Sequence, residues 1–189
     1  MEAAIFTLYR QLLEKVNETT DQLNAKHAQY LTCEKGCDHC CGHLMTFYPV
    51  EIGHMARAIA HMKPQRRKAI IDHLKDFAAR KQDAPCPLLG DDGLCMAYEA
   101  RPVLCRTHGL LLNIATEANG LEIKRSCQLN YTNKETSTFN REDTINQQLI
   151  STLLHRINEA FIQQTGMAPD ERLSPLALPE MIEAGMKNL

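Results

Sequence analysis

The sequence lacks an excess of charge of either sign. Its 189 residues include 21 lysines and arginines against 23 aspartates and glutamates, which gives a formal net charge of -2. A protein that binds the phosphate backbone of nucleic acid, or the anionic surface of a membrane, usually carries a basic patch. The near balance of charge therefore predicts that neither nucleic acid nor a membrane is a partner.

Long apolar runs are missing as well. No stretch approaches the roughly 20 apolar residues that a membrane-spanning helix needs. Residues 1–10 do not combine a basic start with an uninterrupted apolar run, which a secretory signal would require. We therefore expect the protein to remain in the cytoplasm, where disulfides are rarely maintained.

Catalytic signatures are also lacking. The sequence contains no recognisable glycine-rich phosphate loop, no Ser/His/Asp order and no paired catalytic carboxylates. It has no internal repeat and no low-complexity segment either. No enzymatic activity is assigned on these grounds, because such an assignment would rest on analogy alone.

What the sequence does contain is cysteine. The eight residues fall into a compact C-x3-C-x2-C-C cluster and a set spread over a turn-rich segment: Cys33, Cys37, Cys40 and Cys41, then Cys86, Cys95, Cys105 and Cys127. In a reducing compartment such spacing indicates metal or redox chemistry rather than crosslinks. Thiolate is a soft ligand for zinc and iron, and four thiolates complete a tetrahedron or hold an iron–sulfur cluster.

Local geometry limits which sulfurs can share a metal. If residues 37–41 are helical, Cys37, Cys40 and Cys41 project from one face, and Gly36 lets the chain fold Cys33 back toward them. The adjacent pair Cys40-Cys41 would point about 100° apart on a helix, so one of the two can serve a different metal. Two separate ions, a binuclear site with bridging sulfur, and one four-cysteine cluster all remain compatible with the spacing.

Apolar periodicity predicts a mainly α, small α+β fold in a single domain over residues 1–189. Helices are expected over 2–30, from Pro49 to about 63, from Pro64 onward, from Ile145 to near Gly166, and from Pro179. The interval from 130 to 143 is polar and is expected to form a surface loop.

Between these helices, residues 33–127 are expected to form a cysteine-bearing metal-binding insert. One hairpin is predicted around Asp92-Gly93, with Cys86 and Cys95 on either side, and a second over 110–124 around Asn119-Gly120. One or two helical turns are expected from Ala97 to near Pro102, with Cys105 just after them and Cys127 at the end of the second hairpin.

Several neighbouring side chains have two interpretations. Arg101 and Arg106 could offset the negative charge of several thiolates or donate hydrogen bonds to sulfur, although Arg101 could equally cap the short helix before Pro102. His39 and His43 lie in and beside the cluster and are further candidate ligands. Tyr98 is expected to be buried over the first hairpin, and the helical histidines, His27 among them, are expected at the surface or its boundary.

Four stretches of the sequence together resemble the bacterial YkgJ-like cysteine-cluster family. They are Cys33-x3-Cys37-x2-Cys40-Cys41, Cys86-Pro87-Leu88-Leu89, the run from Asp92 through Cys95 to Glu99, and Arg101-Pro102-x2-Cys105-Arg106. That family is described as zinc- or iron-chelating, so the resemblance, over about residues 33–127, implies metal binding by the matched cysteines. Flagellin lysine N-methylases share the cysteine pattern. Many relatives carry a further cysteine shortly after the position of Arg106; here His108 stands nearby, and imidazole is also a zinc ligand.

Three functions follow from these observations. The preferred one is a metal-binding protein that holds zinc or iron through its eight cysteines. The alternative is an iron–sulfur redox protein or an accessory to a methylase-like, protein-modifying system. A thiol oxidoreductase ranks last, because it needs a low-pKa cysteine beside a resolving partner, for which Cys37-x2-Cys40 is the candidate.

Overall fold

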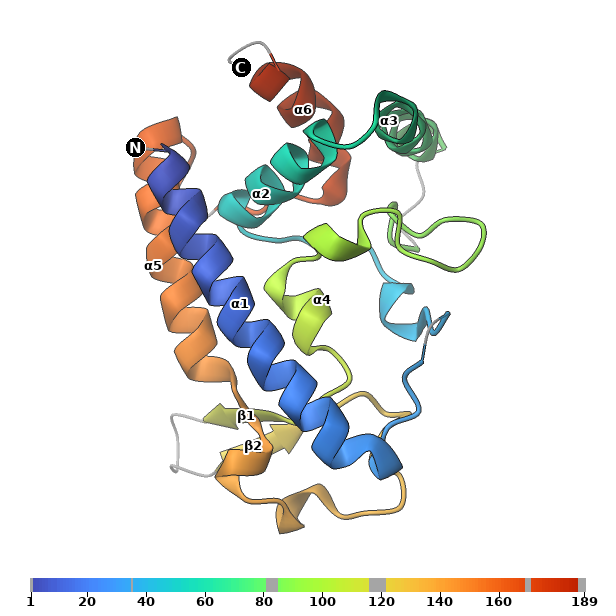
Figure 1. Ribbon diagram of the computed structural model, residues 1–189, viewed down its shortest axis with the longest axis vertical. Helices are drawn as coiled ribbons and strands as arrows, with labels where there is room; N and C mark the ends of the chain where they lie inside the picture. Colours follow the sequence, from blue (N-terminus) through green and yellow to red (C-terminus); the bar gives the residue numbers. More distant parts are fainter. Residues whose placement is uncertain (1, 35, 81–84, 116–121, 169–170, 187–189) are drawn as a thin grey trace. The chain divides into compact units, whose positions relative to one another are not determined.

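The computed structural model describes residues 2–34, 36–80, 85–115, 122–168 and 171–186. In this part of the chain the secondary structure is mainly helical (Figure 1), with α1 (Glu2–His27), α2 (Pro49–Ala60), α3 (Pro64–Ala79), α4 (Val103–Thr107), α5 (Gln147–Thr165) and α6 (Leu178–Met186). A small sheet contains β1 (Leu112–Ala115), β2 (Glu122–Arg125) and β3 (Ile145–Asn146). The mainly α, small α+β class predicted from the sequence is confirmed.

The chain divides into two compact units. The first unit contains residues 1–6, 35–102 and 158–189, and the second contains residues 7–34 and 103–157. Helices α1 and α5 each contribute residues to both units. The cysteines are divided in the same way, and each unit is described separately below.

In the first unit, α2 and α3 both pack against α6 (Figure 1). Helix α2 begins with Pro49, whose fixed φ suits a first helical position. The carboxylate of Glu51 accepts the N–H of Tyr48 (3.1 Å), and the side-chain oxygen of Asn158 accepts the N–H of Val50 (3.2 Å). These contacts satisfy donors that have no partner inside the helix. The apolar face of α2 is fully buried, and α3 and α6 contribute Leu74 and Ile182 to the same core.

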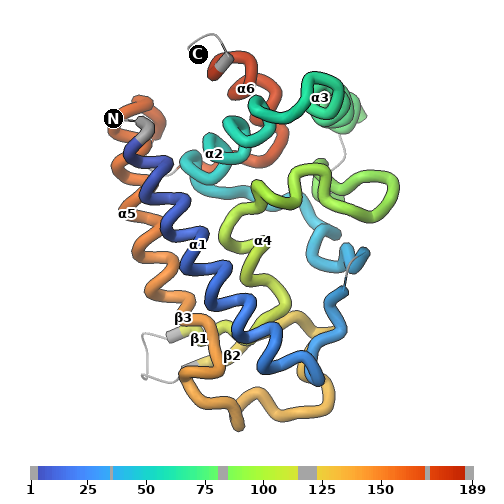
Figure 2. The backbone as a smooth tube through the Cα atoms, viewed as in Figure 1, coloured from blue at the N-terminus to red at the C-terminus, as the bar shows by residue number. Residues whose placement is uncertain are grey.

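In the second unit, the sheet has the strand order β2-β1-β3. Strands β1 and β2 are antiparallel, with Leu112 opposite Arg125, and β1 and β3 are parallel, with Leu112 opposite Ile145. Figure 2 traces the three strands. Leu23 of α1, Leu110 and Ile145 form a buried hydrophobic cluster in this unit.

The hairpin predicted over 110–124 is confirmed as β1 and β2; its predicted turn, Asn119-Gly120, lies outside the described residues. Strand β3 was not predicted, because Ile145 was assigned to the following helix. The helix instead begins at Gln147, since the side-chain oxygen of Asn146 accepts the N–H of Leu149 (3.0 Å) and caps it.

Among the described residues, no helix combines the length and the apolar content that crossing a bilayer demands.

Candidate metal centre

All eight cysteines lie in the described part of the chain, and all are present as thiols rather than disulfides. The first unit holds five of them and the second unit holds three: Cys37, Cys40, Cys41, Cys86 and Cys95, then Cys33, Cys105 and Cys127. Cys33 and Cys37 are exposed, Cys127 is buried, and the others are half-buried. The compact cluster of the sequence is therefore shared between the two units.

The backbone of this cluster is not the α-helix considered from the sequence. A single 3-10 turn covers His39–Cys41, and its amino end is Asp38, with φ -111° and ψ 5°. Gly36 precedes it at φ +96°, a conformation that favours glycine. Cys37 therefore lies before the helical turn and does not share one helical face with Cys40 and Cys41.

The predicted hairpin around Asp92-Gly93 is confirmed in a short form. Leu89 and Cys95 form an antiparallel bridge, and the N–H of Met96 donates to the carbonyl of Leu88 (2.8 Å). The carboxylate of Asp92 accepts the N–H of Leu94 (3.0 Å), which closes the turn, while Gly93 has φ +74°. The hairpin thus brings the backbone of residues 86–89 alongside that of residues 94–96.

A backbone contact joins this hairpin to the first cysteine cluster. The N–H of Cys86 donates to the carbonyl of Cys41 (2.7 Å). Burial is the main cause that raises the pKa of the Cys86 and Cys95 thiols; the charges of Cys95 and Cys40 add to the rise for Cys86, and the charge of Cys40 adds to it for Cys95. Cys40 therefore lies within electrostatic reach of Cys86 and Cys95, which are more than 40 residues further along the sequence.

Hydrogen-bond donors and a positive charge oppose this rise in the pKa of Cys86 and Cys95. Backbone hydrogen bonds from Leu88 and Leu89 lower the pKa of Cys86, and a backbone hydrogen bond from Ala97 lowers that of Cys95. Each N–H that points at sulfur favours the charged thiolate over the thiol. The positive charge of Arg101 also lowers the pKa of Cys95.

Arg101 is held in place by Tyr98. Its guanidinium lies 3.5 Å from the centre of the Tyr98 ring, and its Nε donates to the Tyr98 carbonyl (3.0 Å). Arg101 therefore ends the 3-10 turn Tyr98–Ala100, as one interpretation of the sequence stated. Its role toward metal-bound thiolates stays a prediction. The prediction that Tyr98 is buried is wrong: it is 54% exposed and supports the arginine with its ring face.

Helix α4 changes the expected position of Cys105. The turn before Pro102 is present, but a helix then follows it, so that Cys105 lies inside α4 rather than after a helical turn. Pro102 does not end the helical structure here, since a proline immediately before a helix costs no internal hydrogen bond. Arg106, on the same helix, donates to the side chain of Asn17 (3.0 Å).

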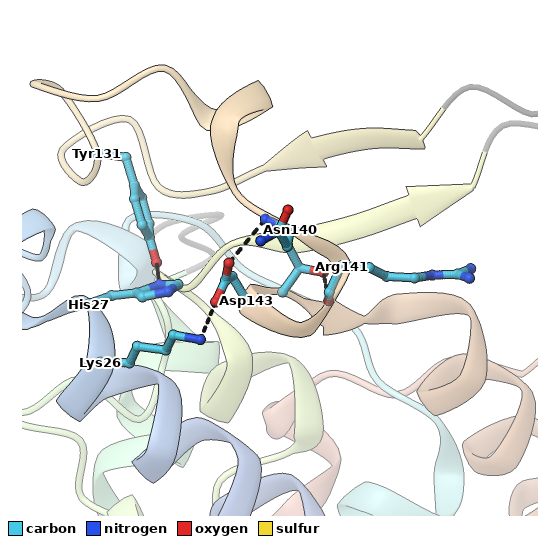
Figure 3. Close-up of polar contacts among 7 residues, drawn as sticks. Lys26, His27, Tyr131, Asn140, Arg141 and Asp143 are labelled. Atoms are coloured by element: carbon cyan, nitrogen blue, oxygen red, sulfur yellow. Dashed lines mark hydrogen bonds and ion pairs between the residues drawn. The ribbon is translucent and has the colours of Figure 1, made fainter.

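The predicted surface loop over 130–143 is partly wrong. Asn130, Tyr131 and Asp143 are all buried. His27, which was expected at the surface or its boundary, is only 1% exposed, and its Nδ1 lies 2.8 Å from the Tyr131 hydroxyl (Figure 3). Lys26 pairs with Asp143 in the same region, and this contact lowers the pKa of the carboxyl group. Composition alone did not identify these polar residues as buried, because each depends on a partner distant in sequence.

The donor set suits a soft metal, although the thiols are not yet arranged around one. Within the described ranges, no three His, Cys, Asp or Glu side chains form a group already able to hold an ion. His39, His43 and His108 are exposed, and their assignment as ligands stays a prediction.

Comparison with known proteins identifies a family. No curated protein and no solved structure matches the chain. Residues 32–143 match the model of the family CxxCxxCC, described as "Putative zinc- or iron-chelating domain". The match includes the predicted region 33–127 and covers more than half of the chain. The protein therefore belongs to this cysteine-cluster family, as the resemblance in its sequence indicated.

Proposed function

We propose that this protein binds zinc or iron through its cysteine thiolates, with Cys40, Cys86 and Cys95 contributing to one centre. The observation that carries the proposal is that Cys40, in the 3-10 turn, and Cys86 and Cys95, on the hairpin, lie within reach of one another's charge inside the segment 35–102 of the first unit. The backbone bond between Cys41 and Cys86 supports it, because it holds the turn and the hairpin together.

The surroundings of these thiols favour a cation as the ligand. Buried thiolates that lie close together are disfavoured by desolvation and by mutual repulsion, and a bound divalent ion offsets both effects. The N–H groups of Leu88, Leu89 and Ala97, with the charge of Arg101, offset only part of the rise in the pKa of Cys86 and Cys95 that burial causes. Metal binding would deprotonate the thiols and release their protons to solvent.

The remaining cysteines are assigned to the same function. Cys37 and Cys41 belong to the same unit and can supply the further ligands that a tetrahedral site needs. Cys33, Cys105 and Cys127 of the second unit are proposed as metal ligands as well. Eight thiolates are enough for two tetrahedral ions.

Elemental analysis and absorption spectroscopy of the anaerobically purified protein test this proposal. A colourless protein with about one to two zinc ions per chain, or one with iron but no acid-labile sulfide, agrees with it. Iron together with acid-labile sulfide, and visible absorption from sulfur-to-iron charge transfer, would instead establish the iron–sulfur alternative. A protein that takes up neither metal refutes the proposal.

Serine variants locate the centre. Cys40→Ser, Cys86→Ser and Cys37→Ser are each expected to lose metal, because serine does not replace thiolate as a ligand for these ions. Asp91→Asn is the matched control, since this exposed carboxylate lies on the same hairpin and is not a proposed ligand. Full metal content in Cys86→Ser, or an equal loss in Asp91→Asn, would contradict the assignment.

A further inference from the structure

A buried amide in the second unit contacts one of the proposed ligands. Asn130 is only 4% exposed. Its Nδ2 donates to the Gly109 carbonyl (2.8 Å) and to the Cys33 sulfur (3.2 Å), while its Oδ1 accepts the N–H (2.9 Å) and the hydroxyl (3.0 Å) of Thr32. The Cys33 sulfur also lies 3.6 Å from Oδ1, to which its S–H can donate. Both donor hydrogens of the amide are therefore used, and its oxygen accepts at least the Thr32 N–H.

The backbone determines which end of the amide faces the sulfur. The Thr32 N–H can only donate, and the Gly109 carbonyl can only accept, so Oδ1 must face the first and Nδ2 the second. One hydrogen of Nδ2 is used by Gly109. The other is directed at the Cys33 sulfur. A neutral thiol can also donate to Oδ1, whereas a thiolate can only accept, and Nδ2 is the donor that the amide offers it.

The chain around this amide is held closely. Gly109 has φ +97°, and a Cβ at this position would lie 3.1 Å from the Cys33 sulfur and 3.2 Å from Asn130 Nδ2. The N–H of Asn130 donates to the Cys127 carbonyl (3.0 Å), and the N–H of Tyr131 donates to the Tyr30 carbonyl (2.7 Å). Asn130 thus has contacts with two of the three cysteines of its unit, one through its side chain and one through its backbone.

We propose that Asn130 is a positioning residue that orients Cys33 and stabilises it as a thiolate ligand through the N–H···S hydrogen bond. This inference rests on the proposed function. Hydrogen bonds to an ionised acceptor are roughly twice as strong as those between neutral groups, so this contact favours the metal-binding form of the sulfur. Removal of such an outer partner typically lowers metal affinity by about 10–100-fold.

The variant Asn130→Asp tests the role of the donor. Aspartate has nearly the same shape and keeps an acceptor for Thr32, but it replaces the NH2 group with an oxygen that repels a thiolate. Thr32→Val is the matched control, because it removes a hydrogen bond to the same amide and leaves the contact with sulfur in place. Circular dichroism establishes that each variant is folded.

The probe is Co2+, titrated anaerobically and followed by thiolate-to-cobalt charge-transfer absorption. Asn130→Asp is expected to bind Co2+ at least about 10-fold more weakly than the wild type. Alkylation followed by mass spectrometry should show that Cys33 loses its protection by Co2+ while Cys86 keeps it. Thr32→Val should behave as the wild type. Wild-type affinity and full protection of Cys33 in Asn130→Asp would overturn the inference.

A measurement on the wild-type protein does not depend on the folding of any variant. In 1H–15N spectra, the two side-chain amide protons of Asn130 should exchange slowly with solvent, and one of them should shift on addition of Zn2+. Fast exchange with no shift in a protein that binds Zn2+ overturns the role of Asn130 alone. A wild type that binds neither ion refutes the proposed function together with this inference.

Discussion

Replacing Gly109 by alanine is expected to lower the free energy of unfolding, through backbone strain and a steric contact. At φ +97° an L-residue costs about 1–2 kcal/mol more than glycine. The new methyl group would lie 3.1 Å from the Cys33 sulfur and 3.2 Å from Asn130 Nδ2, and such overpacking typically costs about 1–3 kcal/mol. Alanine offsets about 0.4–1 kcal/mol by reducing the entropy of the unfolded chain. The net loss is about 1–4.5 kcal/mol.

Gly166 provides the matched control. It also has a positive φ, +71°, but a Cβ placed on it would meet nothing within 4 Å. Gly166→Ala should therefore show the backbone cost alone, about 1 kcal/mol or less after the same entropic offset. The difference between the two variants isolates the steric contact with Cys33 and Asn130.

The assay is urea denaturation of metal-free, reduced protein, followed by circular dichroism and treated as two-state where the transition permits. Gly109→Ala should have the lower free energy of unfolding of the two variants, with unchanged dependence on urea concentration. If Gly109→Ala loses no more stability than Gly166→Ala, the close approach of Gly109 to Cys33 does not exist in solution, and the argument for Asn130 weakens with it.

Three further predictions concern charge, pH and metal. Arg101→Gln should weaken metal binding by about 10-fold, because the positive charge that acts on Cys95 is lost, and Arg101→Lys should have an intermediate affinity. A metal competition titration measures these affinities, and equal values for wild type and Arg101→Gln would contradict the prediction. Burial lowers the pKa of His27, so the unfolded chain binds a proton more readily than the folded protein does. The free energy of unfolding should therefore not change with pH well above the ordinary pKa of about 6.5, and should fall as the pH drops below it, by at most about 1.4 kcal/mol per pH unit. Urea titrations from pH 7.5 to 5.5 should show a smaller fall in His27→Gln than in the wild type, and parallel curves would count against it. Finally, a chelator added to the metal-bound protein should lower its melting temperature, and an unchanged melting temperature after complete metal removal would show that the metal does not stabilise the fold.

Much of the architecture was predictable from local pattern. Pro49 and Pro64 were expected to begin helices and do so, because a proline at the first helical position loses no internal hydrogen bond. The Asp92-Gly93 turn was predictable too, because neighbouring residues form it: the side chain of Asp92 accepts the N–H of Leu94, and Gly93 adopts a positive φ. The family itself was identifiable from cysteine spacing and the residues around it.

Other features depended on partners far away in the chain. Strand β3 exists because Ile145 pairs with Leu112, and Asn130 is buried because Cys33, Thr32 and Gly109 surround its amide. The division of the cysteines, with Cys33 in one unit and Cys37 in the other, cannot be read from a motif in which they are four residues apart. Spacing along a chain determines which side chains are available for metal chemistry, whereas packing decides which of them meet, because long-range contacts are set by the burial of both segments at once.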